Sequence, residues 1–306
     1  MILSVMKHRG DYMHTLQSDY KYCEEIIKKH SKSFYFAFSR LEEQDRNSIY
    51  AVYAFCRLAD DAVDEVETED EKFKNIKHLQ NLLEAFKQGN TPDGPVWRAL
   101  RDVHERYALD LNMMALQLEG QEMDVDFKQP ENIDELEVYS EKVAGSVGLL
   151  LLPIICNNEL NQRAKQASSL GVAMQYTNIL RDVGEDISYL DRVYLPKDMM
   201  NSFGVTVNQL KAGRVDENFI KLWESIAQLA EEKYEAFLEE INHYKAEAQY
   251  GLLLAVNVYR EILSEVRRNN YDCFKEKHFV SKTRKAIIAT EVMALLNQLR
   301  KENVYE

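Results

Sequence analysis

The chain has 306 residues and a formal net charge of −13, from 51 acidic and 38 basic residues. Binding to nucleic acid or to an anionic membrane surface selects basic patches, so we expect no nucleic-acid partner for so acidic a chain. The chain contains only 11 Gly and 5 Pro, about half their usual share, and 45% of its residues are hydrophobic, which predicts long uninterrupted helices around a sizeable core.

The cysteines and the apolar stretches bear on the cellular compartment. The four cysteines lie far apart along the chain, at Cys23, Cys56, Cys156 and Cys273. Because no Cys-x-x-Cys pair occurs, we expect neither a disulfide framework nor a zinc site, and we expect a reducing, cytoplasmic location. The first ten residues lack the pattern of a signal peptide. The longest apolar stretch, residues 147–156, is too short to span a bilayer and predicts a buried helix.

Helical patterning begins near residue 19. Residues 1–18 are interpreted as a loose N-terminal extension, and a helix is expected from there to about residue 30. The segment His30-Ser-Lys-Ser-Phe34 then interrupts the pattern. The next helix is expected over about 43–66, with an apolar face at helical spacing, and its last turns carry the acidic sequence Asp60-Asp61-Ala-Val-Asp64.

The rest of the chain also reads as helices. They are expected over about 70–88, 96–107, 109–126 and 131–156. A helix over about 159–188 carries a second acidic cluster, Asn178 to Asp186, and residues 190–196 form the loop that leaves it. Three further helices are expected over about 216–245, 247–270 and 280–300. Since no strand-like alternation of useful length and no shift in composition occurs, the pattern predicts an all-α fold without a visible domain boundary.

Each acidic cluster lies on one stripe of its helix. At about 100° per residue, a stripe roughly 60° wide holds Tyr53, Arg57, Asp60 and Asp64. A second stripe, roughly 80° wide, holds Gln175, Asn178, Asp182 and Asp186. Two facing stripes of oxygen ligands would form a site for a hard divalent cation such as Mg²⁺, which keeps waters and takes its remaining ligands from substrate phosphates. The implied substrate is a diphosphate held through metal, whose charge would invert the local negative field.

These patterns also have ordinary structural interpretations. An acidic run on a helix is usually a solvated surface, but the second cluster repeats the i, i+4 carboxylate pair and adds two neutral amide oxygens, which is improbable by chance. Arg57 and Arg181 are either ion-pair partners of neighbouring carboxylates or contacts to diphosphate oxygens. The segment His30-Ser-Lys-Ser33 is either a simple N-cap turn or a diphosphate cradle. Tyr53 and Tyr259 are ordinarily packing aromatics, although Tyr53 shares the stripe of the first cluster.

Taken together, these segments resemble the squalene and phytoene synthase family of head-to-head prenyl transferases, over about residues 19–298. The resemblance is carried by His30-Ser-Lys-Ser-Phe34, Tyr53-Ala-Phe-Cys-Arg-Leu-Ala-Asp-Asp-Ala-Val-Asp64, Val143-Ala-Gly-Ser-Val-Gly148, residues 175–186 and Arg192-Val-Tyr-Leu-Pro196. Several independent motifs occur in the order typical of the family. Within the family, the chain is most similar to the bacterial dehydrosqualene (4,4'-diapophytoene) synthases.

The resemblance implies a single-domain isoprenoid synthase fold over residues 19–306, with a central active-site cavity. It implies about two or three Mg²⁺ ions that bridge the diphosphate. Their ligands would be Asp60, Asp64, Asn178, Asp182 and Asp186. The prenyl diphosphates would be bound by His30, Ser31, Lys32, Ser33, Tyr53, Arg57, Gln175, Arg181 and Tyr259. The implied catalytic residues are Asp60, Asp64, Asp182 and Tyr139, the last of which matches a family tyrosine near the reacting carbons.

The chain departs from the family pattern at two places. The stretch Tyr139-Ser-Glu141-Lys-Val143 lacks the second aromatic residue or His that usually follows the family tyrosine. Near the C-terminus, where relatives often carry Arg, the chain has Lys275-Glu-Lys277-His. The family pattern therefore matches this chain less closely around Tyr139 and around residues 275–278 than at the acidic clusters.

The implied reaction is the condensation of two farnesyl diphosphates, through presqualene diphosphate, to dehydrosqualene in carotenoid biosynthesis. NADPH is not expected, because the chain is most similar to dehydrosqualene synthases and shows no nucleotide site, although squalene synthases of the family need no dinucleotide fingerprint. A loose membrane association would serve product release. Enzymes of the same fold remain as alternatives, namely a squalene or phytoene synthase or a prenyl diphosphate phosphatase. A non-catalytic helical binding protein is an alternative of another class, although both acidic clusters are intact.

Overall fold

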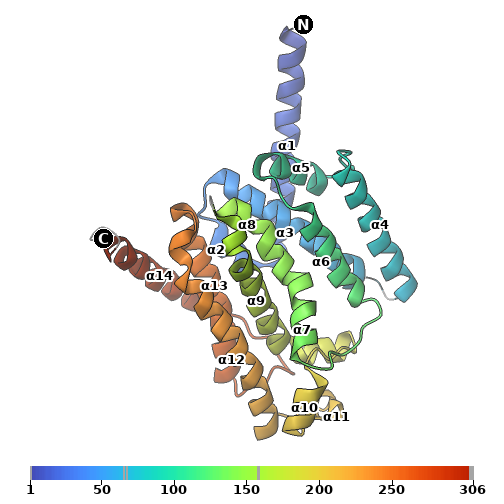
Figure 1. Ribbon diagram of the computed structural model, residues 1–306, viewed down its shortest axis with the longest axis vertical. Coiled ribbons are helices and arrows are strands. Elements are labelled where there is room, and N and C mark those ends of the chain that lie inside the picture. The colour runs from blue at the N-terminus through green and yellow to red at the C-terminus, as the bar shows by residue number, and fades with distance from the viewer. Residues whose placement is uncertain (1, 65, 67, 157–158, 303–306) are drawn as a thin grey trace.

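The protein is built of helices joined by turns and loops (Figure 1). This computed structural model describes residues 2–64, 66, 68–156 and 159–302, with side chains described from Thr15 to Lys301 outside those gaps. No strand occurs in these ranges. The prediction of an all-α fold is therefore confirmed.

The helices follow the expected order along the chain. The first third forms α1 (Ile2–His30), α2 (Lys32–Phe38), α3 (Glu43–Asp64), α4 (Glu69–Lys87), α5 (Pro95–Tyr107) and α6 (Leu111–Met123). The middle forms α7 (Ile133–Ser140), the π-helical segment η1 (Glu141–Gly145), α8 (Ser146–Ile155) and α9 (Leu160–Tyr189). The last third forms α10 (Lys197–Phe203), α11 (Val207–Lys211), α12 (Glu217–Glu239), the 3-10 helix η2 (Ile241–His243), α13 (Ala246–Arg268) and α14 (Lys282–Glu302).

Three local expectations are corrected by the structure. Helix α1 begins at Ile2 rather than near residue 19, so residues 2–18 continue a helix whose C-terminal part packs on the body. A nucleated helix extends at little cost through neighbouring residues that contain no strong breaker, and residues 2–18 contain no proline. The short helices α10 and α11 were not expected from the pattern, because their few residues show too little periodicity. The helix expected over about 131–156 contains a π-helical turn, η1.

The break after α1 has a local cause at Ser31. Its side chain caps α2 by accepting a hydrogen bond from the backbone N–H of Phe34 at 3.4 Å. A side-chain oxygen at this position satisfies one of the free N–H groups of a new helix. The N-cap interpretation of this segment is thus confirmed, and it leaves the neighbouring hydroxyl and ammonium groups available for other contacts.

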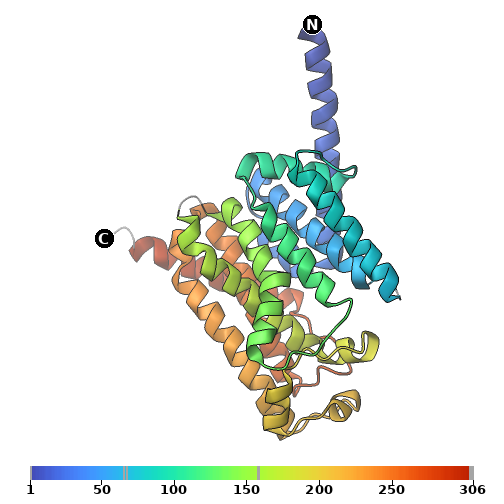
Figure 2. The same cartoon turned by 45° about the vertical axis from the view of Figure 1, so that its right-hand side comes forward.

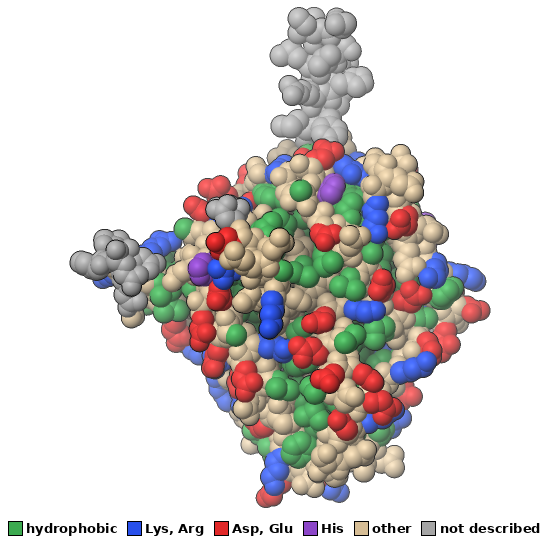
Figure 3. Space-filling view, in the orientation of Figure 1, with side chains coloured by type: hydrophobic (Ala, Val, Ile, Leu, Met, Phe, Trp, Pro, Cys, Tyr) green, Lys and Arg blue, Asp and Glu red, His purple; other side chains and the backbone are tan. Residues whose placement is uncertain are grey.

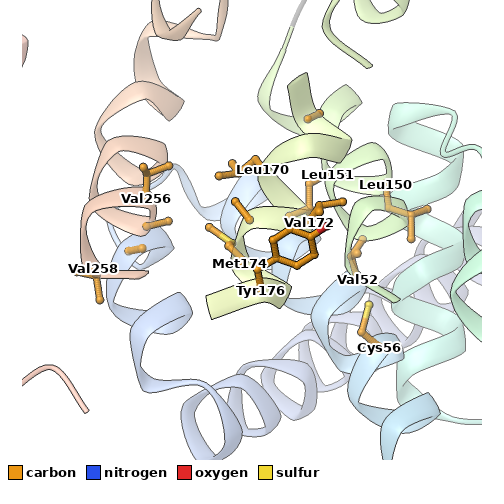
Figure 4. Packing of buried hydrophobic residues seen from close by; sticks show 14 of the residues in the cluster. Val52, Cys56, Leu150, Leu151, Leu170, Val172, Met174, Tyr176, Val256 and Val258 are labelled. Atoms are coloured by element: carbon orange, nitrogen blue, oxygen red, sulfur yellow. The ribbon is translucent and has the colours of Figure 1, made fainter. Parts of the chain in front are cut away.

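Helix α9 lies at the centre of the fold. It packs against α8, η1, α12 and α13, and one continuous hydrophobic cluster includes residues from all of them. Figure 4 shows Val172, Met174 and Tyr176 of α9 among buried side chains of the neighbouring helices α3, α8 and α13. Because a single core joins the N-terminal and C-terminal helices, the described chain forms one domain.

The apolar stretch 147–156 belongs to this core. By length and composition alone, the helical stretch Ile133–Ile155 would pass for a membrane span, and half of its most apolar window is buried. The helix of this stretch, α8, packs against α6 and α9. Gly171 of α9 also lets the backbone of η1 come close, since a Cβ atom at position 171 would lie 2.2 Å from the carbonyl oxygen of Ala144. We therefore assign the stretch to the protein interior, as the sequence predicted.

The two ends of the chain extend away from this body. In Figures 1 and 2, the first turns of α1 project on one side, and the last turns of α14 project on another. The face shown in Figure 3 carries acidic and basic side chains interspersed with smaller hydrophobic areas. The acidic clusters that the sequence singles out lie on the central helices α3 and α9, within the body.

Candidate active site

The first acidic cluster occupies the last two turns of α3. This helix buries Cys56, Ala59 and Val63 on its apolar face, and the carboxylates project from the border of that face. The side-chain amide of Gln121 on α6 donates a hydrogen bond to Asp60 Oδ1 at 2.6 Å. Arg192, from the loop after α9, donates to Asp64 Oδ1 at 3.3 Å. Asp60 and Asp64, the two carboxylates of this cluster that were predicted to bind metal, are thus each held by a donor from another segment.

The second cluster lies on the C-terminal half of α9. Arg181 forms a two-pronged ion pair with Asp182, with N–O distances of 2.7 and 2.5 Å. The ammonium group of Lys277 lies 3.3 Å from Asp182 Oδ2 and 2.7 Å from Glu185 Oε2. One turn before Asp182, the amide of Asn178 donates to the Gln175 oxygen at 3.4 Å.

A glycine in the second cluster allows a distant loop to reach it. The backbone N–H of Gly184 donates to the carbonyl oxygen of Cys273 at 3.1 Å. A Cβ atom at position 184 would lie only 2.4 Å from the Cα atom of Phe274, so the loop could not dock against any larger residue. This contact places Lys277 on the cluster, and the C-terminal departure from the family pattern therefore lies inside the site.

Two buried cross-links bring the clusters together. Arg192, which is only 4% exposed, hydrogen-bonds Asp64 of the first cluster and lines the same small pocket as Asp186 of the second, where its charge opposes the rise in the pKa of Asp186 that burial causes. On the other side, the ring of Phe34 packs against Tyr53 of α3 at 6.3 Å and against Tyr259 of α13 at 5.6 Å, and the charge of Arg181 opposes the rise in the pKa of Tyr259 that burial causes. The prediction that the two stripes face a common site is supported by these contacts.

The carboxylates resist ionisation where no cation lies between them. Burial, and then repulsion by Asp64, raises the pKa of Asp60 to about 8. Burial, followed by repulsion from Asp182 and Glu185, raises the pKa of Asp186 to about 8. Like charges held close together in a poorly solvated site favour the protonated form, and a bound divalent cation reverses that preference.

The donor chemistry of the two clusters suits Mg²⁺. The first cluster offers carboxylates, and the second adds the amide oxygens of Gln175 and Asn178 to its carboxylates. Within the described ranges, no three His, Cys, Asp or Glu side chains come together closely enough to hold a metal ion by themselves. Mg²⁺ typically binds through one or two carboxylates and completes its shell with water and substrate phosphate, so pairs of ligands fit that ion.

The segment after α1 forms the third wall of the site. Ser31 caps α2 here, and the ring of Phe34 packs edge-on against the Tyr259 ring at 5.6 Å. Lys285 of α14 donates a hydrogen bond to Ser33 Oγ at 2.9 Å. Burial, and then the charge of Lys32, lowers the pKa of Lys285. Two ammonium groups beside serine hydroxyls form a suitable environment for an anion.

The remaining residues that the sequence singled out lie close by. His30 ends α1 and is half-buried. Arg57 forms an ion pair with Asp61 one turn later on α3. The ion-pair interpretation of Arg57 and Arg181 is therefore confirmed, and their contact with a diphosphate stays a prediction.

Tyr139 belongs to a buried network that the sequence did not reveal. Its hydroxyl donates to Asp124 Oδ2 at 2.9 Å, while the hydroxyl of Tyr194 donates to Asp124 Oδ1 at 2.8 Å. Arg192 donates to the backbone oxygen of Asp124 at 2.7 Å. Burial raises the pKa of Asp124 to about 6, while Arg192 and the two tyrosines oppose the shift, so the carboxylate is ionised at neutral pH. The network therefore joins Tyr139, through Asp124 and Arg192, to the first cluster.

A small pocket lies beside this network. It is lined by Asp186, Arg192, Tyr194 and apolar residues, and its volume of about 10 Å³ has room for about one water molecule. Sequence patterns could have suggested Arg192 and Tyr194, since both lie in a motif that carried the family resemblance. No comparable signal marked Asp124, Gln121 or Lys285.

The fold and the site define the class of the protein. A single all-α domain, in which two acidic helices converge on a partly buried polar site, is an isoprenoid synthase fold. A crystal structure of a dehydrosqualene synthase in complex with ligand superimposes with a TM-score of 0.89 and 42% sequence identity, covering 94% of this chain and 99% of that chain.

Comparison of sequences gives the family. The family model described as squalene/phytoene synthase matches residues 27–285, so the chain belongs to this family and is a prenyltransferase. It is 35% identical to a 4,4'-diapophytoene synthase of Staphylococcus haemolyticus over 277 residues, which are 89% of this chain and 95% of the relative. It is 32% identical to a phytoene synthase of Arthrospira platensis over 278 residues, which are 87% of this chain and 89% of the relative. The family resemblance inferred from the motifs is confirmed.

Proposed function

We propose that the protein condenses two farnesyl diphosphates head to head, through presqualene diphosphate, to dehydrosqualene, and that the reaction requires Mg²⁺. The observation that carries this proposal is the convergence of the two acidic clusters on Arg192, which hydrogen-bonds Asp64 and lines the same small pocket as Asp186. The likeness to a diapophytoene synthase and to a dehydrosqualene synthase supports the choice of substrate and product.

The acidic clusters would hold the metal ions. The ligands would be Asp60, Asp64, Asn178, Asp182 and Asp186. When bound, Mg²⁺ neutralises the leaving diphosphate and so lowers the barrier to breaking the allylic carbon–oxygen bond. Lys32, Ser33 and Lys285 lie together and would bind diphosphate oxygens that the metal leaves free, since charge-assisted hydrogen bonds to phosphate are the strong ones.

The aromatic residues beside the cradle would face the organic part of the reaction. Phe34 packs against Tyr259 at 5.6 Å and against Tyr53 at 6.3 Å, so three rings from α2, α3 and α13 form one group. Aromatic faces stabilise a cation without acting as nucleophiles, and a site closed to water protects the cation from hydrolysis.

The reaction would proceed in two stages, each of which releases one diphosphate and one proton. In the first, diphosphate leaves one substrate, the double bond of the second substrate attacks the allylic cation, and loss of a proton closes the cyclopropane ring of presqualene diphosphate. In the second, loss of the remaining diphosphate and a rearrangement produce a cation whose proton loss forms dehydrosqualene. Tyr139, whose hydroxyl is bonded to the ionised Asp124, is placed to assist proton removal.

The phytoene synthase of Arthrospira platensis supports a second candidate, a longer prenyl substrate in the same site. Product analysis distinguishes the candidates. Purified protein is incubated with farnesyl or geranylgeranyl diphosphate and Mg²⁺, with and without NADPH and with excess chelator, and the extracted products are identified by mass. We expect dehydrosqualene from farnesyl diphosphate, no effect of NADPH and no product with chelator.

Each other outcome points to a different enzyme. Conversion to squalene with NADPH would place the protein among squalene synthases, and a strong preference for geranylgeranyl diphosphate would favour phytoene synthesis. Release of farnesol would identify a phosphatase. Full turnover in excess chelator would refute the metal role of the acidic clusters.

We further propose that the enzyme works in the cytoplasm and associates loosely with a membrane to release its product. All four cysteines are buried and no disulfide joins any of them in the described part of the chain, which supports a reducing compartment. Cell fractionation tests this: activity that stays in the membrane fraction after a high-salt wash would contradict a loose association.

A further inference from the structure

The hydrogen bond between α6 and Asp60 has a consequence for metal binding. Gln121 lies in the last turn of α6 and is 7% exposed, and its Nε2 atom donates to Asp60 Oδ1 at 2.6 Å. The two residues are 61 positions apart, so only the packing of α6 against α3 brings them together. This bond occupies one oxygen of Asp60, and the described part of the chain shows no hydrogen bond to the other oxygen.

The donor to Asp60 is neutral, whereas other cluster carboxylates are paired with cations. Arg192 donates to Asp64, and Arg181 and Lys277 contact Asp182. An arginine or lysine competes with a metal for the negative charge of the carboxylate. An amide orients the carboxylate without neutralising it, and partners of this kind around ligating groups tune metal affinity.

The position of Gln121 is held from two sides. Its neighbour Glu122 accepts a hydrogen bond from Gln80 of α4 at 2.8 Å and lies 3.1 Å from the Lys77 ammonium. On the other side, Gly120 approaches η1 so closely that a Cβ atom would lie 3.0 Å from the backbone nitrogen of Val143. The amide therefore points at Asp60 from a rigid support.

We propose that Gln121 is a positioning residue, which orients the Asp60 carboxylate so that its free oxygen binds the metal of the first cluster. This inference rests on the metal role in the proposed function. It concerns a residue that no motif marked, and the role acts through Asp60.

The chain offers a matched control on the same helix. Gln117 lies one turn before Gln121 and is 1% exposed, and neither polar atom of its side chain has a hydrogen-bond partner among the described residues. Gln121→Met and Gln117→Met each replace a buried amide with an apolar side chain of similar length. Gln121→Leu provides a second replacement at the test position. Circular dichroism and thermal melting establish that each variant folds.

The primary measurement is metal binding without substrate. Free Mn²⁺ is counted by electron paramagnetic resonance as the ion is titrated into each protein, and Mg²⁺ is then added as competitor. We expect Gln121→Met and Gln121→Leu to weaken binding about tenfold or more, and Gln117→Met to leave binding unchanged. The Mg²⁺ concentration for half-maximal product formation should rise by the same factor, while turnover at saturating Mg²⁺ stays close to that of the wild type.

The outcomes separate this inference from the proposed function. Unchanged Mn²⁺ binding in both Gln121 variants, with or without a lower melting temperature, would overturn the inference and leave the proposed function standing. Equal weakening in Gln117→Met would also overturn it, because a general disturbance of α6 would then be the cause. Wild-type protein that binds neither ion, either alone or with inorganic diphosphate added to complete the metal shell, would overturn the metal role and the inference with it.

Discussion

Replacing Tyr139 with Phe tests the buried network beside the first cluster. The change keeps the ring, which stacks on Tyr194 at a centroid distance of 5.2 Å, and removes the hydroxyl that donates to Asp124 at 2.9 Å. Asp124 is 6% exposed and ionised at neutral pH, so the lost bond is one to a buried charge. Such bonds contribute about 1.5–3 kcal/mol to the free energy of unfolding.

The expected loss is measurable. For a chain of this size, about 2 °C is lost for each kcal/mol, so the melting temperature should fall by about 3–6 °C. If the hydroxyl also assists proton removal, product formation should slow and more presqualene diphosphate should be released. Melting temperature, turnover and released intermediate are measured on the same preparation.

Tyr194→Phe is the matched control, because it removes the other hydroxyl that donates to Asp124, at 2.8 Å. We expect a similar loss of stability in this variant and a smaller effect on turnover. Normal turnover in a destabilised Tyr139→Phe protein would remove Tyr139 from the catalytic residues. An unchanged melting temperature would refute the argument that the bond to Asp124 stabilises the fold.

Three further predictions concern the acidic clusters. Asp60→Ala and Asp182→Ala should each abolish product formation while helical content is kept. The melting temperature of the metal-free protein should stay the same or rise, because crowded carboxylates repel one another. An unfolded variant would instead identify that residue as structural. Gly184→Ala should destabilise the protein by about 1–3 kcal/mol, since its Cβ atom would lie 2.4 Å from Phe274 Cα, and urea unfolding that matches the wild type would contradict this contact. The pKa of Asp60 is raised to about 8, well above its usual value, so between about pH 4 and 8 the folded state holds a proton that the unfolded state has lost. The free energy of unfolding of the metal-free protein should therefore fall as pH rises through this range. Urea unfolding beside Asp60→Asn isolates this contribution, and an equal pH dependence in both proteins would refute it.

Local patterns predicted the parts of the fold that depend on neighbours along the chain. The helices α3 and α9 were expected within a few residues of their bounds, because apolar residues recur at helical spacing in both. The same spacing placed Asp60 and Asp64, and likewise Asp182 and Asp186, on one stripe each. The start of α1 and the short helices α10 and α11 were missed, because helix extension and packing, rather than periodicity, decide such elements.

The sequence by itself thus determined the helical class, the two acidic stripes and, through its motifs, the family. Only the tertiary structure decided which donors hold the carboxylates. Gln121 reaches Asp60 across 61 positions, Arg192 reaches Asp64 across 128, and Lys285 reaches Ser33 across 252. Such contacts carry no local pattern, because they depend on how helices cross in space. The physical reason is that helix formation is governed by interactions within a few residues, whereas the protonation and orientation of a buried carboxylate are governed by whatever the whole chain packs against it.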